Sequence, residues 1–451
     1  MPSRKKALIS NGKKEKDPVN QMLIYSPHIT PRLQYLAAWL GEQTGTIPLC
    51  TDNKILFEKS EELKINYSEN RISKQEIWIK PAGLLNEKGI TQHSVEVSKI
   101  GRLQIFFRNE SDLGFDYLSA AFYLISRYEE YFPFEEDLYG RYPHTDSIAF
   151  RNNFLQVPLV DEWTLLLLNK ISMVFPETVI HPPSFNFIPT YDIDIPWKFK
   201  GKGILRNLGG VLRDPKITFR RMMVLAGLQK DSFDSYSFLE KHHSKLKLSP
   251  LYFFLTAPNR SKLDKNIHPS NKRFQKLIQE TANNYEVGIH PSVYSHSSKQ
   301  ALKTEKDLLS SISKKVISKS RFHFLKCLLP KDYRRLIEVG VADDYTMGYG
   351  TVNGFRASTS RSFIWYDLMK EEITSLRIHP FCWMDANSYY ELQMSPQEAY
   401  AELLTYINQI KKVNGTMITV SHNHLLGDDS FFQGWKEMYV KFLEQVTDMK
   451  Q

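Results

Sequence analysis

The chain has 451 residues, of which 42% are hydrophobic and 13% are aromatic, so it can bury a large core and is not a disordered chain. Lysine and arginine outnumber aspartate and glutamate by 59 to 50. No apolar stretch reaches the length that crosses a bilayer, so we expect no transmembrane segment. The three cysteines have neither CxxC nor zinc-ribbon spacing, which favours a reducing compartment. The basic first twenty residues lack the apolar core of a secretory signal, and we expect a cytoplasmic protein.

Three basic runs account for much of the positive charge: the tail, residues 198–221 and residues 299–321. Each run is typical of a solvated helix face or loop rather than of a nucleic-acid groove. We therefore expect no nucleic-acid partner. A basic surface could still attract an anionic glycan, a lipid-linked phosphate or the face of a membrane, as a peripheral contact.

The pattern along the chain divides it into three parts. Residues 1–20 are expected to form a disordered basic tail, residues 21–180 a small N-terminal α/β domain, and residues 185–451 a larger domain. Within the second part, apolar periodicity predicts two strands and three helices. The strands are Gln21–Tyr25 and Glu76–Ile79, and the helices are Pro31–Leu40, Tyr117–Tyr131 and Glu162–Phe175.

The third part alternates short apolar runs with helical stretches. The predicted strands are Phe185–Tyr191, Leu251–Thr256, Glu286–His290, Arg321–Lys326, Leu376–Trp383 and Thr416–His422. The predicted helices are Ser237–Lys245, Lys272–Asn284, Lys299–Lys314, Pro330–Val339, Ser395–Val413 and Gln433–Val446. Such alternation favours a parallel sheet wound or closed by helices, as in a (β/α) barrel. A barrel places its functional side chains just after the strands, at the carboxyl-terminal rim.

The first predicted strand of the third part runs into two carboxylates. Asp192 and Asp194 are separated by one residue, so strand alternation sends both to the same face. One carboxylate can then hold a metal ion while the other acts as a general base. Taken alone, the pair fits a turn or a helix cap slightly better, because aspartate often ends a strand.

Histidines follow or occupy three of the other predicted strands. His290 ends the third strand, in Val-Gly-Ile-His-Pro-Ser292, and is a natural imidazole ligand for zinc or a similar cation. His323 alternates with bulky apolar neighbours and shares a face with Arg321 and Leu325. The last strand runs into His422-Asn-His424, where a general acid for a leaving amine would fit. Each histidine alone is more often a packed or surface residue, but the coincidence at four strands is harder to dismiss.

Further polar residues lie between these strands. Arg356, in Gly-Phe-Arg-Ala-Ser358, could fix the orientation of a catalytic carboxylate, or it could belong to a salt-bridged surface loop. Asp344 precedes it and Asp385 follows the next strand. Both could support the site, or both could be ordinary turn residues.

In combination, these motifs resemble the polysaccharide deacetylase superfamily (carbohydrate esterase family four, the NodB-homology barrel). The resemblance rests on the order Asp-Ile-Asp194, His-Pro-Ser292, Gly-Phe-Arg356 and the late strand ending in His422. More narrowly, the chain resembles the bacterial deacetylase-like proteins that carry an extra N-terminal α/β domain. That likeness rests on residues 120–130, 137–142, 157–163, 422–426 and 434–439.

The resemblance implies a distorted (β/α) barrel of the polysaccharide deacetylase type, preceded by a smaller α/β domain. It also implies a metal-dependent hydrolase that removes an acetyl group, N-acetyl before O-acetyl, from a sugar or polysaccharide precursor. The implied cofactor is a divalent metal, with zinc as the first choice. The implied roles are a metal ligand for Asp194 and for His290, the general base for Asp192, its tether for Arg356 and the general acid for His422.

The chain departs from the family at the second motif, which usually carries a histidine pair at i and i+4. The residue four after His290 is Tyr294, and the nearest other imidazole there is His296. We expect His323 to complete the metal site from the next strand, because a strand-end ligand can reach the barrel axis. His424, Asp344, Asp385, Ser292 and His296 are expected to contact substrate or to support these ligands.

Three hypotheses follow. The first is a metal-dependent deacetylase acting on an acetylated sugar or glycan. The second is a catalytically weakened pseudo-deacetylase that binds carbohydrate or acts as a scaffold, which the missing i+4 histidine favours. The third is a different hydrolase using the same carboxylate–metal centre. Two aspartates, an arginine and an opposed imidazole in the expected order favour the first.

Overall fold

The computed structural model describes residues 20–203, 207, 217–259 and 261–449. The expected tail, residues 1–20, lies outside this part of the chain except for its last residue. Among the helices so described, none is both long and apolar enough to cross a membrane. The structure is a mixed α/β protein with two large sheets, as the sequence predicts.

The N-terminal region, residues 20–176, is built on a four-stranded parallel sheet in the order β2-β1-β3-β4. The strands are β1 (Gln21–Tyr25), β2 (Ile47–Thr51), β3 (Leu63–Tyr67) and β4 (Ile77–Ile79), and a separate hairpin joins β5 (Ser98–Ile100) to β6 (Leu103–Ile105). The helices are α1 (Pro31–Thr44), α2 (Lys54–Lys59), α3 (Tyr117–Ile125), α4 (Ile148–Arg151) and α5 (Leu159–Val174). The predicted strand Gln21–Tyr25 is confirmed with its exact bounds, and β4, α1 and α5 are confirmed with shifted ends.

Local signals set the ends of α1. The Thr30 side chain accepts the Leu33 amide, and Pro31 occupies the first turn, where its missing N–H costs nothing. Gly45, with φ at 68°, ends the helix in the left-handed conformation. The predicted helix Tyr117–Tyr131 is interrupted at Arg127, whose φ is 56°, and only a short 3₁₀ turn follows at Tyr128–Tyr131.

The C-terminal region, residues 186–449, holds a nine-stranded sheet in the order β12-β13-β11-β10-β9-β8-β7-β15-β14. All neighbours in it are parallel except β12 and β13. The strands are β7 (Asn186–Ile193), β8 (Leu251–Phe254), β9 (Glu286–Ile289), β10 (Lys319–Ser320), β11 (Asp343–Asp344), β12 (Phe363–Asp367), β13 (Glu372–Ile378), β14 (Trp383–Met384) and β15 (Thr416–His422). No pairing joins the two ends of this series among the described residues, so a closed barrel is not shown.

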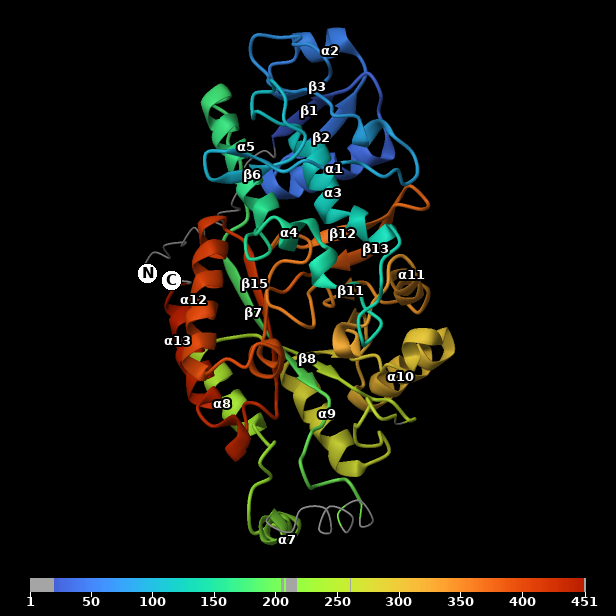
Figure 1. Cartoon of the computed structure of the whole chain (residues 1–451), viewed down its shortest axis with the longest axis vertical. Coiled ribbons are helices and arrows are strands. Elements are labelled where there is room, and N and C mark those ends of the chain that lie inside the picture. Colours follow the sequence, from blue (N-terminus) through green and yellow to red (C-terminus); the bar gives the residue numbers. More distant parts are fainter. Residues whose placement is uncertain (1–19, 204–206, 208–216, 260, 450–451) are drawn as a thin grey trace, which may run out of the picture.

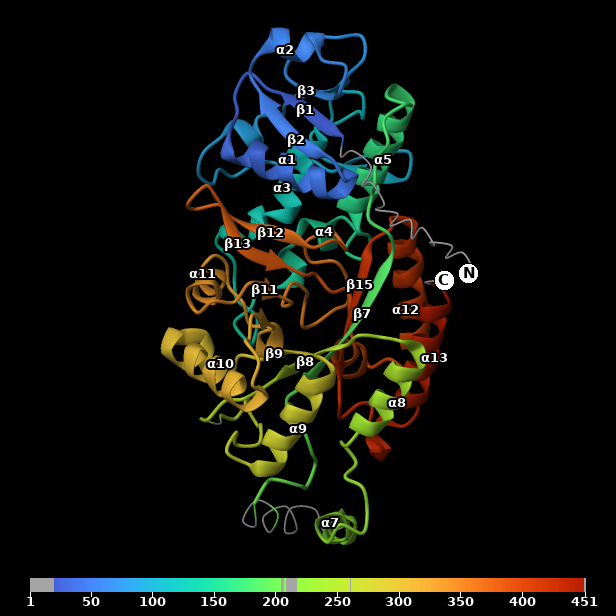
Figure 2. The same ribbon diagram turned by 180° about the vertical axis from the view of Figure 1, so that it is seen from behind.

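Helices flank this sheet (Figures 1 and 2). They are α7 (Thr218–Leu225), α8 (Tyr236–Leu246), α9 (Lys272–Asn284), α10 (Lys299–Ser313), α11 (Lys331–Glu338), α12 (Pro396–Lys412) and α13 (Trp435–Asp448). Helix α12 packs against α13, and α13 packs against α8, along the side of β7 and β15. Helices α9, α10 and α11 lie along the other strands, and α7 projects at the end farthest from the N-terminal region.

Two predicted strands of this region need correction. Arg321–Lys326 is not a strand: β10 ends at Ser320, and a tight 3₁₀ turn follows at His323–Leu325. Leu376–Trp383 is not one strand but two, because β13 ends at Ile378 and β14 begins at Trp383. The apolar runs are real in both places, but they belong to buried loops as much as to strands.

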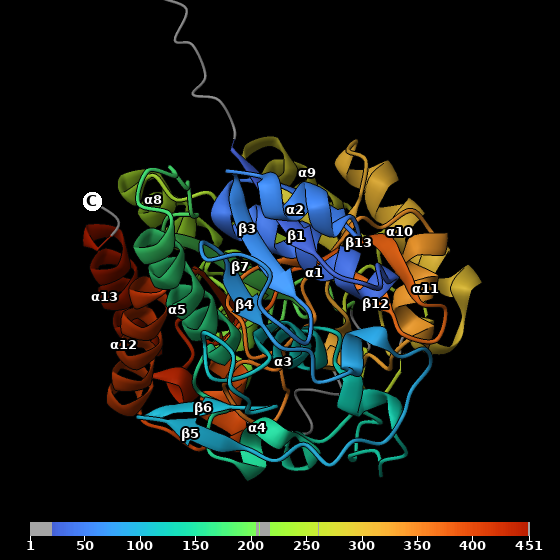
Figure 3. The same cartoon turned by 90° about the horizontal axis from the view of Figure 1, so that it is seen from above.

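One of the hydrophobic clusters spans both regions, whereas a second large cluster lies entirely within the C-terminal region. A continuous cluster of buried side chains runs from the N-terminal sheet and α3 into residues 302–378 of the C-terminal region. At its centre, the Tyr366 ring lies 5.2 Å from the ring of Tyr35 and 5.3 Å from that of Phe122. Viewed from above, the N-terminal sheet lies in front of the middle of the C-terminal region, with β12 and β13 visible beside it (Figure 3). The division at residues 180–185 therefore remains a prediction, since the packing does not separate the parts.

Candidate metal centre

The register of the central strands brings the predicted polar residues to one edge of the sheet. β7 and β15 run parallel with Asp192 opposite His422. β9 pairs with β8 and β10, so that His290 and Arg321, the first residues after β9 and β10, lie side by side. Because parallel strands end at the same edge, side chains from distant parts of the sequence meet there.

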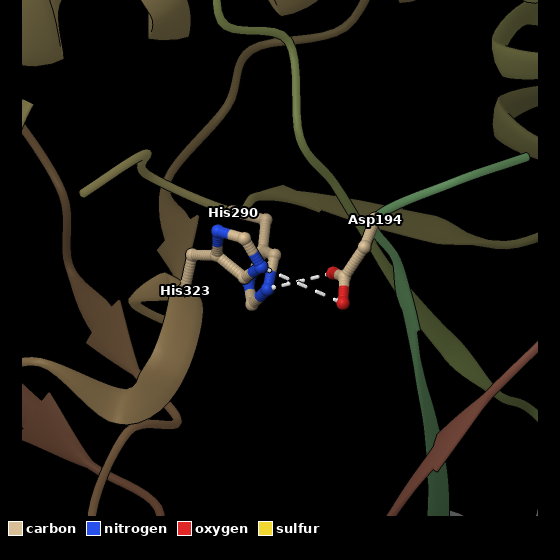
Figure 4. Close-up of side chains that lie close together, drawn as sticks. All are labelled: Asp194, His290 and His323. Carbon is tan, nitrogen blue, oxygen red and sulfur yellow. Dashed lines mark ion pairs between the residues drawn. The ribbon is translucent and has the colours of Figure 1, made fainter. Parts of the chain in front are cut away.

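Asp194, His290 and His323 form a group whose ligand atoms all lie within 4.8 Å of one another. Figure 4 shows the two imidazole rings side by side, both facing the carboxylate. His290 Nε2 lies 3.1 Å from Asp194 Oδ1, and His323 Nε2 lies 3.6 Å from Oδ2. Both histidines are buried, and Asp194 is 17% exposed, so the cluster opens to solvent on the side of the carboxylate.

In both histidines, Nδ1 has a hydrogen-bond partner on the side of the ring away from Asp194. His290 Nδ1 lies 2.6 Å from the carbonyl oxygen of Arg321, which can only accept a proton. His323 Nδ1 lies 2.9 Å from the Asp264 carboxylate. In both rings this leaves Nε2 facing the Asp194 carboxylate, which is the orientation of a metal-binding histidine.

This arrangement fits a cation. Asp194 Oδ1 is buried and has no hydrogen-bond donor among the described residues. Three acceptors that converge on one point need a positive charge between them, either a metal ion or a proton. Two imidazoles and one carboxylate are a donor set that zinc and similar divalent ions accept, and three protein ligands leave room for water.

The charges around the cluster reinforce one another. Burial alone would raise the pKa of Asp194, but His323 and His290 hold that pKa well below its usual range. Burial alone would lower the pKa of His323, but Asp194 and Asp264 outweigh burial and raise the pKa to about 9. The site therefore favours an ionised carboxylate facing a positive charge.

Asp192 lies beside the cluster and is held by Arg321. Arg321 Nη1 donates to Asp192 Oδ1 at 2.8 Å, and its Nε donates to the carbonyl of Tyr345 at 3.0 Å. The expectation for Arg356 is corrected, because its guanidinium donates instead to both oxygens of Glu130, at 2.8 and 2.6 Å. Arg356 thus joins the two regions. Arg321, and not Arg356, is the arginine that contacts Asp192.

His422 faces the cluster from β15. Its Nε2 lies 3.8 Å from Asp194 Oδ2, and its Nδ1 lies 2.6 Å from Asp385 Oδ1. The other oxygen of Asp385 accepts the backbone amide of His422 at 2.7 Å. Burial alone would lower the pKa of His422, but Asp385 and Asp194 raise it to about 10. The ring is thereby fixed in one orientation with Nε2 toward the opening.

The remaining predicted residues fall into two groups. His424 lines the same cavity, and burial beside His422 lowers its pKa to about 3. The other three do not reach the cluster. Ser292 donates to Glu305, His296 lies 3.1 Å from Asp332, and Asp344 accepts from Thr346 in a buried turn.

The cluster lies in a cavity of about 460 Å³. Besides the ligands, its wall includes Leu263, Lys265, Tyr390 and, from the N-terminal region, Tyr139 and Arg141. Two larger surface grooves, of about 680 and 730 Å³, lie away from the cluster and contain none of its residues. Within the described part of the chain, only the cavity at the strand ends combines metal-ligand geometry with room for a substrate.

The sequence analysis did not identify Asp264 as a partner of His323, and it did not predict that Arg321 contacts Asp192. Asp264 lies in the loop between β8 and α9, where no periodicity marks it. For Arg321 the sequence did contain an indication, because strand alternation predicts that it shares a face with His323.

Comparisons with known proteins give limited information. Residues 22–176 match the model of a family of unknown function (DUF7033). No curated protein matches the chain. Solved structures with a similar arrangement include a Mycobacterium smegmatis protein assigned as a polysaccharide deacetylase, at 13% identity and a TM-score of 0.39, over 59% of this chain and 85% of that one.

Two further structures are similar at the same level. The polysaccharide deacetylase Bc1974 of Bacillus cereus has 11% identity and a TM-score of 0.29, over 58% of this chain and 87% of that one. BA3943, a CE4 family pseudoenzyme of Bacillus anthracis, has 10% identity and a TM-score of 0.28, over 59% of this chain and 63% of that one. Such values assign neither a family nor an activity, so the functional conclusion has to come from the site.

Proposed function

We propose that this chain is a divalent-metal-dependent hydrolase that removes an acetyl group, N-acetyl before O-acetyl, from a sugar or polysaccharide precursor. The observation that carries the proposal is the convergence of Asp194, His290 and His323 on one point, with the Asp192–Arg321 and His422–Asp385 pairs beside it. Ligands, a base and an opposed acid within one cavity are the set that amide hydrolysis at a metal needs.

The metal ligands in this proposal are Asp194, His290 and His323. When bound, a divalent ion would polarise the acetyl carbonyl and acidify the attacking water. Zinc is the first choice, because one carboxylate and two imidazoles are typical of catalytic zinc sites. Asp264 and the carbonyl of Arg321 contact Nδ1 of the two rings, which leaves Nε2 of each ring facing Asp194 as the ligand atom.

Asp192 is the proposed general base. Its Oδ1 is held by Arg321, while its Oδ2 lies 3.9 Å from His290 Nε2, next to the ligand cluster. A carboxylate fixed in this way can take a proton from the water that attacks the acetyl carbon. The new C–O bond then forms as the proton passes to Asp192.

His422 is the proposed general acid. The imidazole is held by two contacts to Asp385, and its protonated form is favoured in this environment. Collapse of the tetrahedral intermediate breaks the C–N bond, and the proton on Nε2 passes to the leaving amine. The products are acetate and a free amino sugar, so the proton taken up by Asp192 and the one given by His422 balance.

The test combines metal analysis with an acetate assay on the purified full-length chain. We expect about one divalent ion per chain, and acetate release from N-acetylglucosamine oligomers or from an O-acetylated polysaccharide. Asp192→Asn should abolish acetate release while the metal stays bound. The control is Asp52→Asn, because Asp52 is an exposed carboxylate outside the cavity.

Two outcomes would overturn the proposal. A chain that binds no divalent metal and releases no acetate would not be a hydrolase of this kind. A chain that binds metal and acetylated oligosaccharide, yet releases no acetate, would be a carbohydrate-binding protein or a pseudo-deacetylase. Release of a different acid from a different class of substrate would support the hydrolytic metal centre and contradict the proposed sugar substrate.

A further inference from the structure

The turn that carries His323 has an unusual backbone. Phe324 has φ 57° and ψ 12°, and Leu325 has φ 54°, so two consecutive residues other than glycine lie in the left-handed region. Side chains with a Cβ atom rarely adopt this conformation, and it persists only where the surroundings hold it. His323 is the first residue of this turn.

A loop of the N-terminal region holds the turn from the outside. Arg141 Nη1 donates to the carbonyl of Phe324 at 2.9 Å. The ring of Tyr139 stacks on the ring of Phe324, with 5.0 Å between centroids and 20° between the planes. Both residues also line the cavity that contains the ligand cluster. The contact is therefore directed at the backbone of the strained turn, next to the metal site.

Arg141 is itself fixed before it reaches the turn. Asp137 accepts its Nε at 2.7 Å and its backbone amide at 3.0 Å, and its guanidinium lies 4.8 Å from the centre of the Tyr139 ring. Gly350 lies against it on the other side, where a Cβ would collide with Nη1. The residue is only 5% exposed, and these contacts hold its guanidinium in place.

We propose that Arg141, with Tyr139 stacked below it, is a positioning residue for the metal ligand His323. The N-terminal region then has a defined role, because it completes the metal site of the C-terminal region by holding the turn after β10. This inference rests on the metal centre of the proposed function. It deepens that function, because affinity for the metal becomes dependent on residues about 180 positions away in sequence.

Cobalt(II) titration of the full-length chain tests the inference, because the visible absorption of Co²⁺ reports the number and geometry of its ligands. The variants are Arg141→Met, Arg141→Lys and Tyr139→Ala, with His323→Ala as the reference for a lost ligand. Arg141→Met should bind Co²⁺ about 10- to 100-fold more weakly than the wild type, with a spectrum shifted toward that of His323→Ala. Arg141→Lys, which can make one of the two contacts, should lie between.

The matched control is Arg361→Met. Arg361 is as buried as Arg141 and also joins the two regions, through Gln43 and the carbonyl of Val413, but it lies outside the cavity. The Arg361→Met substitution should lower the melting temperature of the metal-free chain without changing the Co²⁺ spectrum. A metal-free melting temperature measured for every variant separates positioning from general loss of stability.

The results are distinguishable from failure of the proposed function. If the wild-type chain binds no Co²⁺, the metal centre itself is rejected. If the wild type binds Co²⁺ and both Arg141 variants and Tyr139→Ala bind it with the same affinity and spectrum, the metal centre stands and the positioning role is rejected. Equal losses of Co²⁺ affinity in Arg141→Met and Arg361→Met would also reject the positioning role, because a general loss of stability would then explain both.

Discussion

Arg321 and Asp192 form a buried ion pair, with Nη1 2.8 Å from Oδ1, although β8 and β9 separate their strands in the sheet. The guanidinium passes over the ring of Phe253, 4.5 Å from its centre, to reach the carboxylate. The sheet must therefore curl enough to bring β10 toward β7. An arginine directed across the inside of a curled sheet fixes both the shape of the cavity and the direction of the proposed base.

Replacing Arg321 should separate catalysis from metal binding. In Arg321→Met, Asp192 loses its anchor, and we expect acetate release to fall about 10²-fold or more. The metal should stay, because the contact that orients His290 comes from the backbone carbonyl of residue 321, which the substitution keeps. Turnover and metal content measured on the same sample check this. Arg356→Met, which breaks a contact to Glu130, should destabilise the chain and leave the turnover of the folded fraction intact.

The fold was predictable where the local pattern and the tertiary structure agree. The strand Thr416–His422 and the helix Lys272–Asn284 have the predicted ends, because an apolar strand and an amphipathic helix are both visible in the sequence. β10 was not predictable as a two-residue strand, since the apolar residues that follow it pack in a turn. Pairing across a sheet decides such short strands, and the sequence does not display it.

The site was predictable to the extent that parallel strands end at one edge. This rule places Asp194, His290 and His323 together, and they do lie together. It does not choose between Arg356 and Arg321 as partner of Asp192, because that choice depends on Glu130, a residue of the N-terminal region. Asp264 lies in a loop, and only the folded chain brings it to His323.

Asp264 should affect metal affinity without touching the metal. Asp264→Asn removes the charge that fixes His323 Nδ1, and we expect about a 10- to 100-fold loss of metal affinity. Competition with a chelator of known affinity measures the loss. The control is Asp343→Asn, because Asp343 also pairs with a histidine, through Nε2 of His379 at 2.8 Å, and lies outside the cavity. An equal loss in both variants would count against a specific role for Asp264.

His422 is expected to act on turnover rather than on binding of the metal. His422→Ala should retain about one ion per chain and lose acetate release by roughly 10²-fold or more, as expected for a missing general acid. Asp385→Asn should have a smaller effect in the same direction, because the ring stays but loses its charged partner. If His422→Ala loses its metal, His422 is a fourth ligand and the proposed acid has to be sought elsewhere.

The ion network between the two regions should be a large contribution to stability. Glu130 accepts from both Arg127 and Arg356, and all three side chains are buried. Glu130→Gln would remove the counter-charge of the buried Arg356 and leave Arg127 with Glu129 alone, and we expect a loss of about 3–5 kcal/mol in the free energy of unfolding. Urea unfolding measures it. Glu42→Gln breaks the exposed pair with Arg377 instead and should cost about 1 kcal/mol or less.

Glu305 should make stability depend on pH. It is 1% exposed, and burial raises its pKa to about 7, although hydrogen bonds from Ser292 act in the opposite direction. The folded chain therefore keeps a proton on Glu305 that the unfolded chain releases near the ordinary value of 4.5. The contribution of Glu305 to stability is fully present below about pH 4.5 and is lost as the pH rises through 7.

A shift of this size corresponds to about 3 kcal/mol at most between the two ends of that window. Glu305→Gln cannot ionise, so the variant should lose less stability than the wild type when urea unfolding is repeated between pH 5 and pH 8. Glu62→Gln, which changes an exposed carboxylate, should follow the wild-type curve. Parallel curves for the wild type and Glu305→Gln would mean that Glu305 is ionised in the folded chain. The hydrogen bonds from Ser292 would then outweigh burial.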